Sequence, residues 1–156
     1  MNYQLDDIDK KILDFLVENT RMPFTEIAKQ MDVSAGTIHV RVKKMEDAGI
    51  ILGSSLNIDY GKLDYHFTAF IGILLTKSNK TQEVLKELSS IPNVVEASVI
   101  SGKYNIFCKV RAKNTEDAKR IIYQIDDIQD VMRTESMISM EEFLSDKNRL
   151  INAISV

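Results

Sequence analysis

The chain contains 156 residues, of which 44% are hydrophobic and 28% are charged, and its net charge is −3. This apolar content excludes a disordered chain, and the length allows one large domain or two small ones. No apolar run is long enough to cross a membrane, and the first residues lack the layout of a secretion signal. We therefore expect a cytoplasmic protein. Because the chain is acidic overall, any surface for nucleic acid must be a local concentration of cations.

The sequence provides few residues for metal or redox chemistry. Cys108, the single cysteine, lies in an apolar run and is expected to be a buried thiol. His39 and His66 lie far from each other and from Cys108 in the chain, which leaves little from which to build a metal site. We expect neither a metal nor a cofactor.

Two helices are predicted near the N-terminus. Leu5-Asp6-Asp7-Ile8-Asp9 is typical of a capped helix start, and apolar residues follow it at helical spacing. The second predicted helix spans residues 23–31. Its initial proline is compatible with a helix, because proline is tolerated in the first turn. The acidic residues of the first helix are expected to lie away from the third helix; they are Asp6, Asp7, Asp9 and Asp14.

The third predicted helix follows Ser34, which is a good N-cap, and ends near Gly49. Ile38, Val42 and Met45 recur at helical spacing and predict a buried stripe. Small residues on the first turn would let the backbone approach DNA bases, and the cations further along would bind phosphates or guanine edges. The candidate DNA-contacting residues are Ser34, Ala35, Gly36, Thr37, His39, Arg41, Lys43 and Lys44. A short turn between the second and third helices predicts a helix-turn-helix.

The remaining chain divides into a linker, a second domain and a tail. We predict a helix-turn-helix domain over residues 1–52, and a linker with a short strand over residues 53–66. The second domain spans residues 67–141, and the tail spans residues 142–156. Apolar residues in the tail recur at roughly helical spacing, which fits either a short helix packed on an oligomer or a frayed end.

The second domain contains two similar halves. Strands are predicted at residues 67–75, 94–101, 105–110 and 134–140, and helices at residues 79–90 and 115–125. Ile91-Pro92-Asn93-Val94 aligns with Ile128-Gln129-Asp130-Val131, and the apolar positions of the two helices align at the same offset. Two strand–helix–strand units in tandem predict an α+β protein whose second domain is a ferredoxin-like βαββαβ sandwich. Right-handed crossovers place both helices on one face of the sheet.

The first of these strands is apolar on both faces. Ile71 and Ile73 belong to one face, while Phe70 and Leu74 belong to the other. The two helices can cover only one face, and large exposed apolar patches are rare on monomers. We expect a second copy of the chain to cover the other face.

The N-terminal residues resemble the DNA-binding half of the Lrp/AsnC family of transcription regulators. The resemblance rests on Leu5-Asp6, Ile12-Leu13, Glu26-Ile27-Ala28 and the pattern from Val33 to Ile51, and it continues over nearly the whole chain. It implies a regulator that binds double-stranded DNA, forms homodimers that assemble into octamers, and responds to an amino acid. The family's effector-binding turn and last strand match Ser101-Gly102-Lys103-Tyr104-Asn105 and Arg133-Thr134-Glu135-Ser136. The implied effector-binding residues are Gly102, Tyr104, Asn105, Thr134 and Ser136.

Two departures from the family pattern are visible. Pro23 stands where the family usually has a small polar cap, which affects the start of the second helix. Asn105 stands where the family commonly has Asp, and a neutral amide cannot form an ion pair with an ammonium group.

Two other functions are compatible with this sequence. The chain could be a small-molecule sensor that acts through protein contacts, with its helical half as an interaction domain. It could also be an enzyme, since ferredoxin-like folds host many reactions. We favour a non-enzymatic protein, because the sequence shows no acid–base pair, nucleophile motif, phosphate loop or metal cluster.

Overall fold

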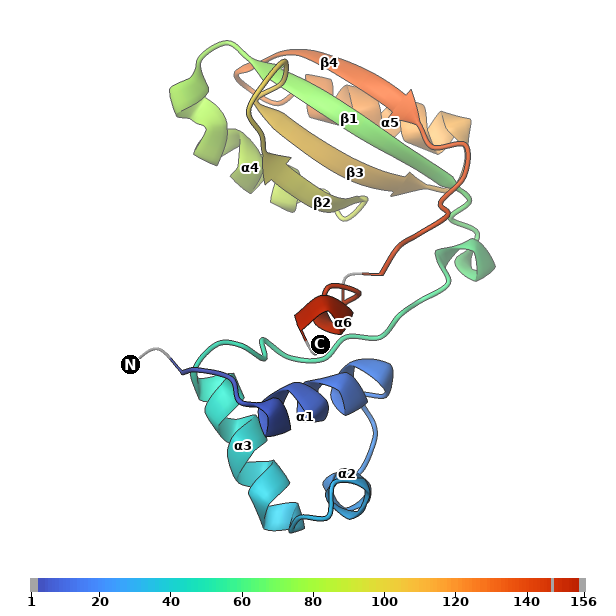
Figure 1. Ribbon diagram of the computed structural model, residues 1–156. Helices are drawn as coiled ribbons and strands as arrows, with labels where there is room; N and C mark the ends of the chain where they lie inside the picture. The colour runs from blue at the N-terminus through green and yellow to red at the C-terminus, as the bar shows by residue number, and fades with distance from the viewer. Residues whose placement is uncertain (1–2, 147, 155–156) are drawn as a thin grey trace. The chain divides into compact units, whose positions relative to one another are not determined.

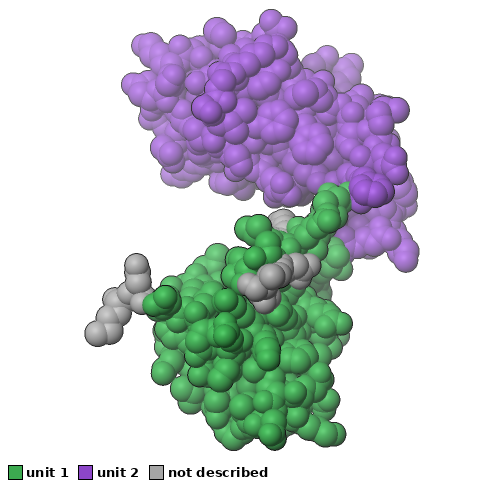
Figure 2. Space-filling view, in the orientation of Figure 1, with its two compact units in different colours: residues 1–57, 144–156 green, residues 58–143 purple. Residues whose placement is uncertain are grey.

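A computed structural model describes residues 3–146 and 148–154. The predicted domain 1–52 and tail 142–156 therefore include residues outside the described part, namely 1–2, 147 and 155–156. The chain forms two compact units: unit 1 comprises Met1–Asn57 and Leu144–Val156, and unit 2 comprises Ile58–Phe143 (Figures 1 and 2). Each unit has its own hydrophobic core.

Unit 1 is the predicted helix-turn-helix. Its helices are α1 (Asp7–Glu18), α2 (Phe24–Gln30) and α3 (Ala35–Asp47), with the short α6 (Ile151–Ile154) from the tail. Asp6 caps α1 by accepting a hydrogen bond from the Asp9 amide, and the Asp9 side chain accepts one from the Asp6 amide in return. Pro23 occupies the N-cap position of α2 and provides no side-chain cap. The core consists of Ile12, Leu13, Ile27, Ala28, Ile38, Val42 and Met45.

The helix α3 begins as predicted and buries the predicted stripe. Ser34 Oγ accepts a hydrogen bond from the Thr37 amide over 3.0 Å. Ile38, Val42 and Met45 are buried in the core, and Gly49 follows the helix with a φ of 72°. Because this left-handed conformation costs glycine little, the chain can turn away directly after the helix.

The tail belongs to unit 1. The helix α6 contacts α1, and Ile151 packs against the core of this unit. The helix is four residues long, much shorter than the apolar spacing of the tail would allow.

Unit 2 is the predicted ferredoxin-like sandwich. Its strands are β1 (Phe67–Leu75), β2 (Val94–Val99), β3 (Ile106–Ala112) and β4 (Val131–Ile138), in the spatial order β2-β3-β1-β4 with every pair antiparallel. The helices α4 (Thr81–Ser89) and α5 (Thr115–Asp126) lie on one side of the sheet (Figure 1). Both pack on the β1 face that carries Ala69, Ile71 and Ile73, each of which is fully buried. The alternation in the sequence placed Ile71 and Ile73 on one face of β1, and the structure shows that this is the face the helices cover.

The linker differs from the prediction. Residues 53–66, all within the described part, contain no strand; instead Tyr60–Leu63 forms a 3-10 helix, η1. Asp59 caps η1 by accepting hydrogen bonds from the amides of Gly61 and Lys62. A short polar side chain that satisfies these amides favours a turn over an extended strand. A second 3-10 helix, η2 (Ser78–Lys80), precedes α4.

The face of the sheet opposite α4 and α5, here called the open face, carries aromatic and charged side chains. The Phe70 and Phe107 rings stack with centroids 5.8 Å apart, and the Tyr104 ring lies beside Phe107. The Tyr104 ring also lies against Gly72, where a Cβ atom would come within 2.7 Å of ring carbons. At one end of this face, Glu142 forms ion pairs with Lys109 and Arg111. The segment after β4 is thereby attached to β3.

Candidate functional site

The exposed face of α3 brings together most of the candidate DNA-contacting residues. Gly36, His39, Lys43 and Lys44 are exposed, and the Ser34 and Thr37 hydroxyls are 2.8 Å apart at the start of the helix. The His39 ring lies 6.0 Å from that of Phe24, between centroids. A surface of small side chains followed by cations thus lies opposite the buried stripe, as the helical spacing predicts.

The lysines of α3 differ in their surroundings. Lys43 forms an exposed ion pair with Asp47 over 2.8 Å, and this pairing raises the pKa of Lys43. An exposed pair of this kind contributes little to stability, so it can be exchanged for a phosphate at small cost. Lys44 is exposed and has no ion-pair partner among the residues that the structure describes. Both side chains can therefore reach an external anion.

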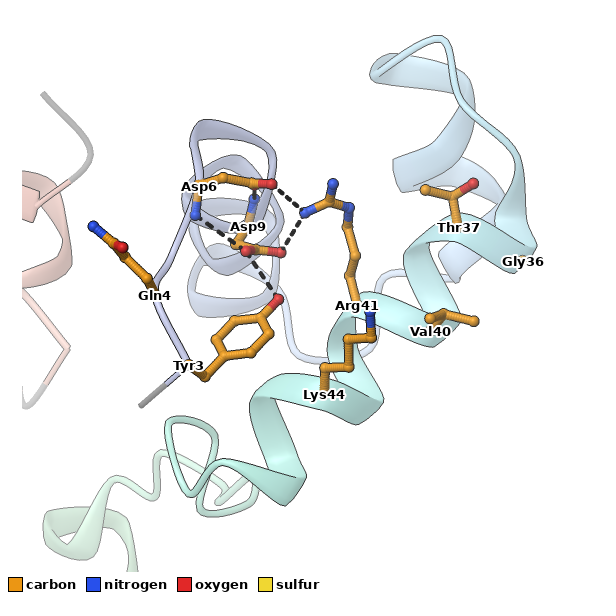
Figure 3. Close-up of a pocket in the computed structure, with 9 residues that line it drawn as sticks. All are labelled: Tyr3, Gln4, Asp6, Asp9, Gly36, Thr37, Val40, Arg41 and Lys44. Carbon is orange, nitrogen blue, oxygen red and sulfur yellow. Dashed lines mark hydrogen bonds and ion pairs between the residues drawn. The ribbon is translucent and has the colours of Figure 1, made fainter. Parts of the chain in front are cut away.

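Arg41 lies in a different environment, directed toward α1. Its Nη1 donates to Asp6 Oδ2 over 2.7 Å and to Asp9 Oδ1 over 2.9 Å (Figure 3). The Asp9 side chain is 1% exposed and that of Arg41 is 24% exposed. The expectation that the acidic residues of α1 lie away from α3 is thus wrong for Asp6 and Asp9, because the capping turn of α1 packs beside the middle of α3.

The pKa shifts in this cluster agree with its geometry. The Asp9 amide and the Arg41 guanidinium lower the pKa of Asp6, while hydrogen bonds to Asp9 and Asp6 raise the pKa of Arg41. Tyr3 donates its hydroxyl to Asp9 Oδ2 over 3.0 Å, and burial together with this bond raises the pKa of Tyr3. The ion pair between Asp6 and Arg41 and the role of Tyr3 as a hydroxyl donor are therefore both favoured by these shifts.

A groove of about 620 Å³ runs between this cluster and α3 (Figure 3). It is lined by Tyr3, Gln4, Asp6, Asp9, Gly36, Thr37, Val40, Arg41 and Lys44. Tyr3 and Gln4 were missed in the sequence analysis because they precede the periodic pattern of α1, and no local signal places them next to α3.

The predicted effector-binding turn connects β2 to β3. Gly102 has a φ of 124° and nothing within 4 Å of a hypothetical Cβ, so glycine is required there by backbone conformation and not by space. Asn105 Oδ1 accepts a hydrogen bond from the Leu75 amide over 2.9 Å, and the Asn105 amide donates to the Ile73 carbonyl over 2.9 Å. Asn105 therefore joins the end of β1 to the start of β3.

The other predicted effector-binding residues lie on two faces of the sheet. Tyr104 lies on the open face and donates its hydroxyl to Glu135 Oε2 over 2.6 Å. Thr134 is opposite Ile73 in the β1–β4 register and donates to Asp126 of α5 over 2.7 Å, which places it on the helix side. Ser136 is opposite Ile71, on the same side as Thr134, and is exposed. Within one chain, these residues do not form a single pocket.

Lys103 and Glu135 form an ion pair that the sequence analysis did not single out. Lys103 Nζ lies 2.6 Å from Glu135 Oε2, and Arg133 lies 3.3 Å from the other oxygen. The hydrogen bond from Lys103 lowers the pKa of Glu135, with a further contribution from Tyr104. The acidic group next to the predicted effector turn is thus already engaged by two cations.

A helix-turn-helix unit joined to a ferredoxin-like unit defines a class of two-domain transcriptional regulators, and comparison with known proteins agrees. Residues 5–46 match the AsnC-type helix-turn-helix domain, and residues 68–148 match the Lrp/AsnC ligand binding domain. The chain belongs to the Lrp/AsnC family and is a transcriptional regulator.

Individual relatives cover almost the whole chain. The regulatory protein AsnC of Haemophilus influenzae is 41% identical over 140 residues, which are 89% of this chain and 93% of that protein. AsnC of Escherichia coli K12 is 38% identical over 141 residues, covering 90% and 93%. The E. coli AsnC structure superposes with a TM-score of 0.87 at 36% identity, over 92% of this chain and 97% of that one.

A more distant structure shares the fold. The complex of the transcriptional regulator NMB0573 from Neisseria meningitidis with L-Met has a TM-score of 0.89 at 19% identity, over 97% of this chain and 99% of that one. No described helix is both long and apolar enough to cross a membrane. No group of three or more potential metal ligands occurs among the described residues.

Proposed function

We propose that this regulator binds specific double-stranded DNA through α3 and acts in the cytoplasm. The observation that carries the proposal is the exposed face of α3, where small residues of the first turn are followed by His39, Lys43 and Lys44. Cations on an acidic chain attract a phosphate backbone when they are grouped on one element, and small side chains leave the bases accessible. The remaining candidate contacts on this face are Ser34, Ala35, Gly36 and Thr37.

We also propose that the chain forms a homodimer through the open face of its sheet, and that dimers assemble further into octamers. The half-buried rings of Phe70 and Phe107 support this proposal, because they form an apolar surface that α4 and α5 do not cover. A two-fold dimer carries two copies of α3, and dimeric helix-turn-helix proteins bind two half-sites of one duplex.

The small-molecule effector is proposed to be an amino acid held where copies of unit 2 meet. The family model for residues 68–148 is a ligand binding domain, and the N. meningitidis protein of the same fold was crystallised with L-Met. Since Tyr104 and Thr134 lie on opposite faces of one sheet, a ligand that touches both kinds of residue needs more than one chain. Gly102, Asn105 and Ser136 complete the proposed set.

A gel-shift experiment tests the proposed DNA binding and the proposed response to an amino acid. The purified chain is incubated with fragments of its genome, first alone and then with each common amino acid in turn. We expect retardation of a small set of fragments, and a change in the concentration needed for retardation with one or a few amino acids. If no fragment is retarded at physiological salt, the alternative of a sensor that acts through protein contacts becomes the better explanation.

A further inference from the structure

The strongest feature outside the proposed contacts is the charged cluster beneath the groove of unit 1. We infer that Arg41 is a positioning residue that orients α3 for DNA, with the buried Asp9 as its anchor, and does not itself bind DNA. This inference rests on the proposed role of α3 in DNA binding. It concerns four side chains from three segments: Tyr3, Asp6, Asp9 and Arg41.

Burial makes Arg41 the obligatory partner of Asp9. The Asp9 side chain is 1% exposed, and burial of an ionised carboxylate is costly unless it is paired and hydrogen-bonded. Its Oδ2 accepts from the Tyr3 hydroxyl and the Asp6 amide, while its Oδ1 accepts from Arg41. No other cation forms a salt bridge with Asp9 among the described residues.

The direction of the side chain argues against a DNA contact. Arg41 extends from α3 toward the capping turn of α1, whereas Thr37 and Lys44 border the same groove along α3 (Figure 3). Both carboxylates are bound by Nη1, at 2.7 and 2.9 Å, so a phosphate contact that drew the guanidinium toward DNA would have to break these two bonds. The exchange would leave the buried Asp9 side chain without its cationic partner, so the gain from one phosphate contact would be offset by that loss.

The same contacts fix the rotation of α3 about its own axis. The core stripe of Ile38, Val42 and Met45 holds the helix by apolar contacts, which tolerate small rotations better than directional hydrogen bonds do. Arg41 adds two charge-assisted hydrogen bonds, to Asp6 and to Asp9, which lie 35 and 32 positions earlier in the chain. A rotation of α3 would move Gly36 and Lys44 relative to a bound duplex, so DNA affinity depends on a residue that does not touch DNA.

The salt dependence of binding separates a contact from a positioning role. Binding of the full chain to a duplex chosen from the retarded fragments is measured by fluorescence anisotropy at several salt concentrations. Loss of one phosphate contact makes the slope of log K against log[salt] shallower by about 0.9. We expect this change for Lys44→Ala. For Arg41→Ala we expect affinity about tenfold lower, a loss of about 1.4 kcal/mol, with the slope unchanged.

Substitution of Asp9 gives a second test, because a DNA-contacting role and a positioning role for Arg41 predict opposite changes in DNA affinity. If Asp9 held Arg41 back from DNA, Asp9→Asn would release it and tighten binding; the positioning role predicts weaker binding with an unchanged slope. Should Asp9→Asn or Arg41→Ala fail to fold by circular dichroism, Asp6→Asn serves instead, because Asn also caps helices while the variant removes one charged partner of Arg41. We then expect binding a fewfold weaker, and tighter binding would overturn the inference.

A matched control removes an arginine paired with an aspartate elsewhere. Arg120 in α5 pairs with Asp117 over 2.7 Å, and Arg120→Ala is expected to leave DNA affinity and slope unchanged. A slope for Arg41→Ala as shallow as that for Lys44→Ala would overturn the inference while leaving the proposed function intact. Failure of the unmodified chain to bind any duplex would overturn both.

Discussion

At the scale of single residues, Asn105 shows how one position can serve both fold and ligand. Its Oδ1 accepts from the Leu75 amide, a bond that an aspartate carboxylate could also form. Its side-chain nitrogen is 3.5 Å from Ser78 Oγ, at the limit of a hydrogen bond. Replacement by aspartate should therefore preserve the strand connection and add a negative charge to the turn.

We predict that Asn105→Asp binds an amino acid more tightly than the unmodified chain does, because the carboxylate can pair with the ammonium group. One charge-assisted hydrogen bond contributes about 1.5–3 kcal/mol. Calorimetric titration of both proteins with the common amino acids measures the difference. Weaker binding by Asn105→Asp would mean that the amide itself selects the ligand.

Gly72 is a second position of interest, because a single added Cβ atom there would change the stability of unit 2. A Cβ atom there would lie 2.7 Å from three ring carbons of Tyr104, whose hydroxyl is bonded to Glu135. We predict that Gly72→Ala lowers the free energy of unfolding by about 1–3 kcal/mol, the usual cost of overpacking. In a Tyr104→Ala background the same substitution should be neutral or stabilising, because alanine reduces the entropy of the unfolded chain. Urea denaturation of the unmodified protein, the two single variants and the double variant gives the coupling energy between the two positions. Equal effects of Gly72→Ala in both backgrounds would exclude the Tyr104 ring as the cause of the destabilisation.

At the scale of elements, the sequence predicted most of the helices and strands. The period of the apolar residues predicted the buried stripe of α3 and the division of β1 into two faces, but not which face of β1 the helices cover, because both faces are apolar. It did not predict the pairing of Arg41 with Asp9, because the two are 32 positions apart and each is typical of an exposed surface. The same holds for Glu142, which reaches Lys109 from outside the sheet.

The two faces of the sheet can be tested with one substitution on each, in β1 and in β3. We predict that Ile71→Asp prevents unit 2 from folding, because Ile71 is fully buried between the sheet and its helices. Phe107→Asp, on the open face, should leave the fold intact and reduce the oligomer to monomers. Circular dichroism reports folding and light scattering reports mass. A folded Phe107→Asp variant with unchanged mass would show that the open face is not the dimer interface.

At the scale of the whole molecule, the two units carry separate sets of carboxylates whose pKa is lowered. In unit 1 the pKa of Asp6 is lowered by its capping bond and by Arg41. In unit 2 the hydrogen bond from Lys109 lowers the pKa of Glu142, and Arg111 adds to the effect. The unfolded chain binds protons at these groups at higher pH than the folded chain does.

The two units should therefore lose stability on acidification through different residues. A lowered carboxylate pKa contributes stability that is present above the unfolded pKa near 4 and lost as pH falls through the folded pKa. We predict that Glu142→Gln flattens this pH dependence in unit 2 and leaves unit 1 unchanged, while Asp6→Asn does the reverse. Native-state hydrogen exchange between pH 3 and pH 7, read separately on peptides from α1 and β3, measures each unit by itself. If either single substitution flattened the pH dependence of stability in both units, the two units would unfold as one cooperative body. A charge in the DNA-binding half would then be linked energetically to the sheet that is proposed to bind the effector.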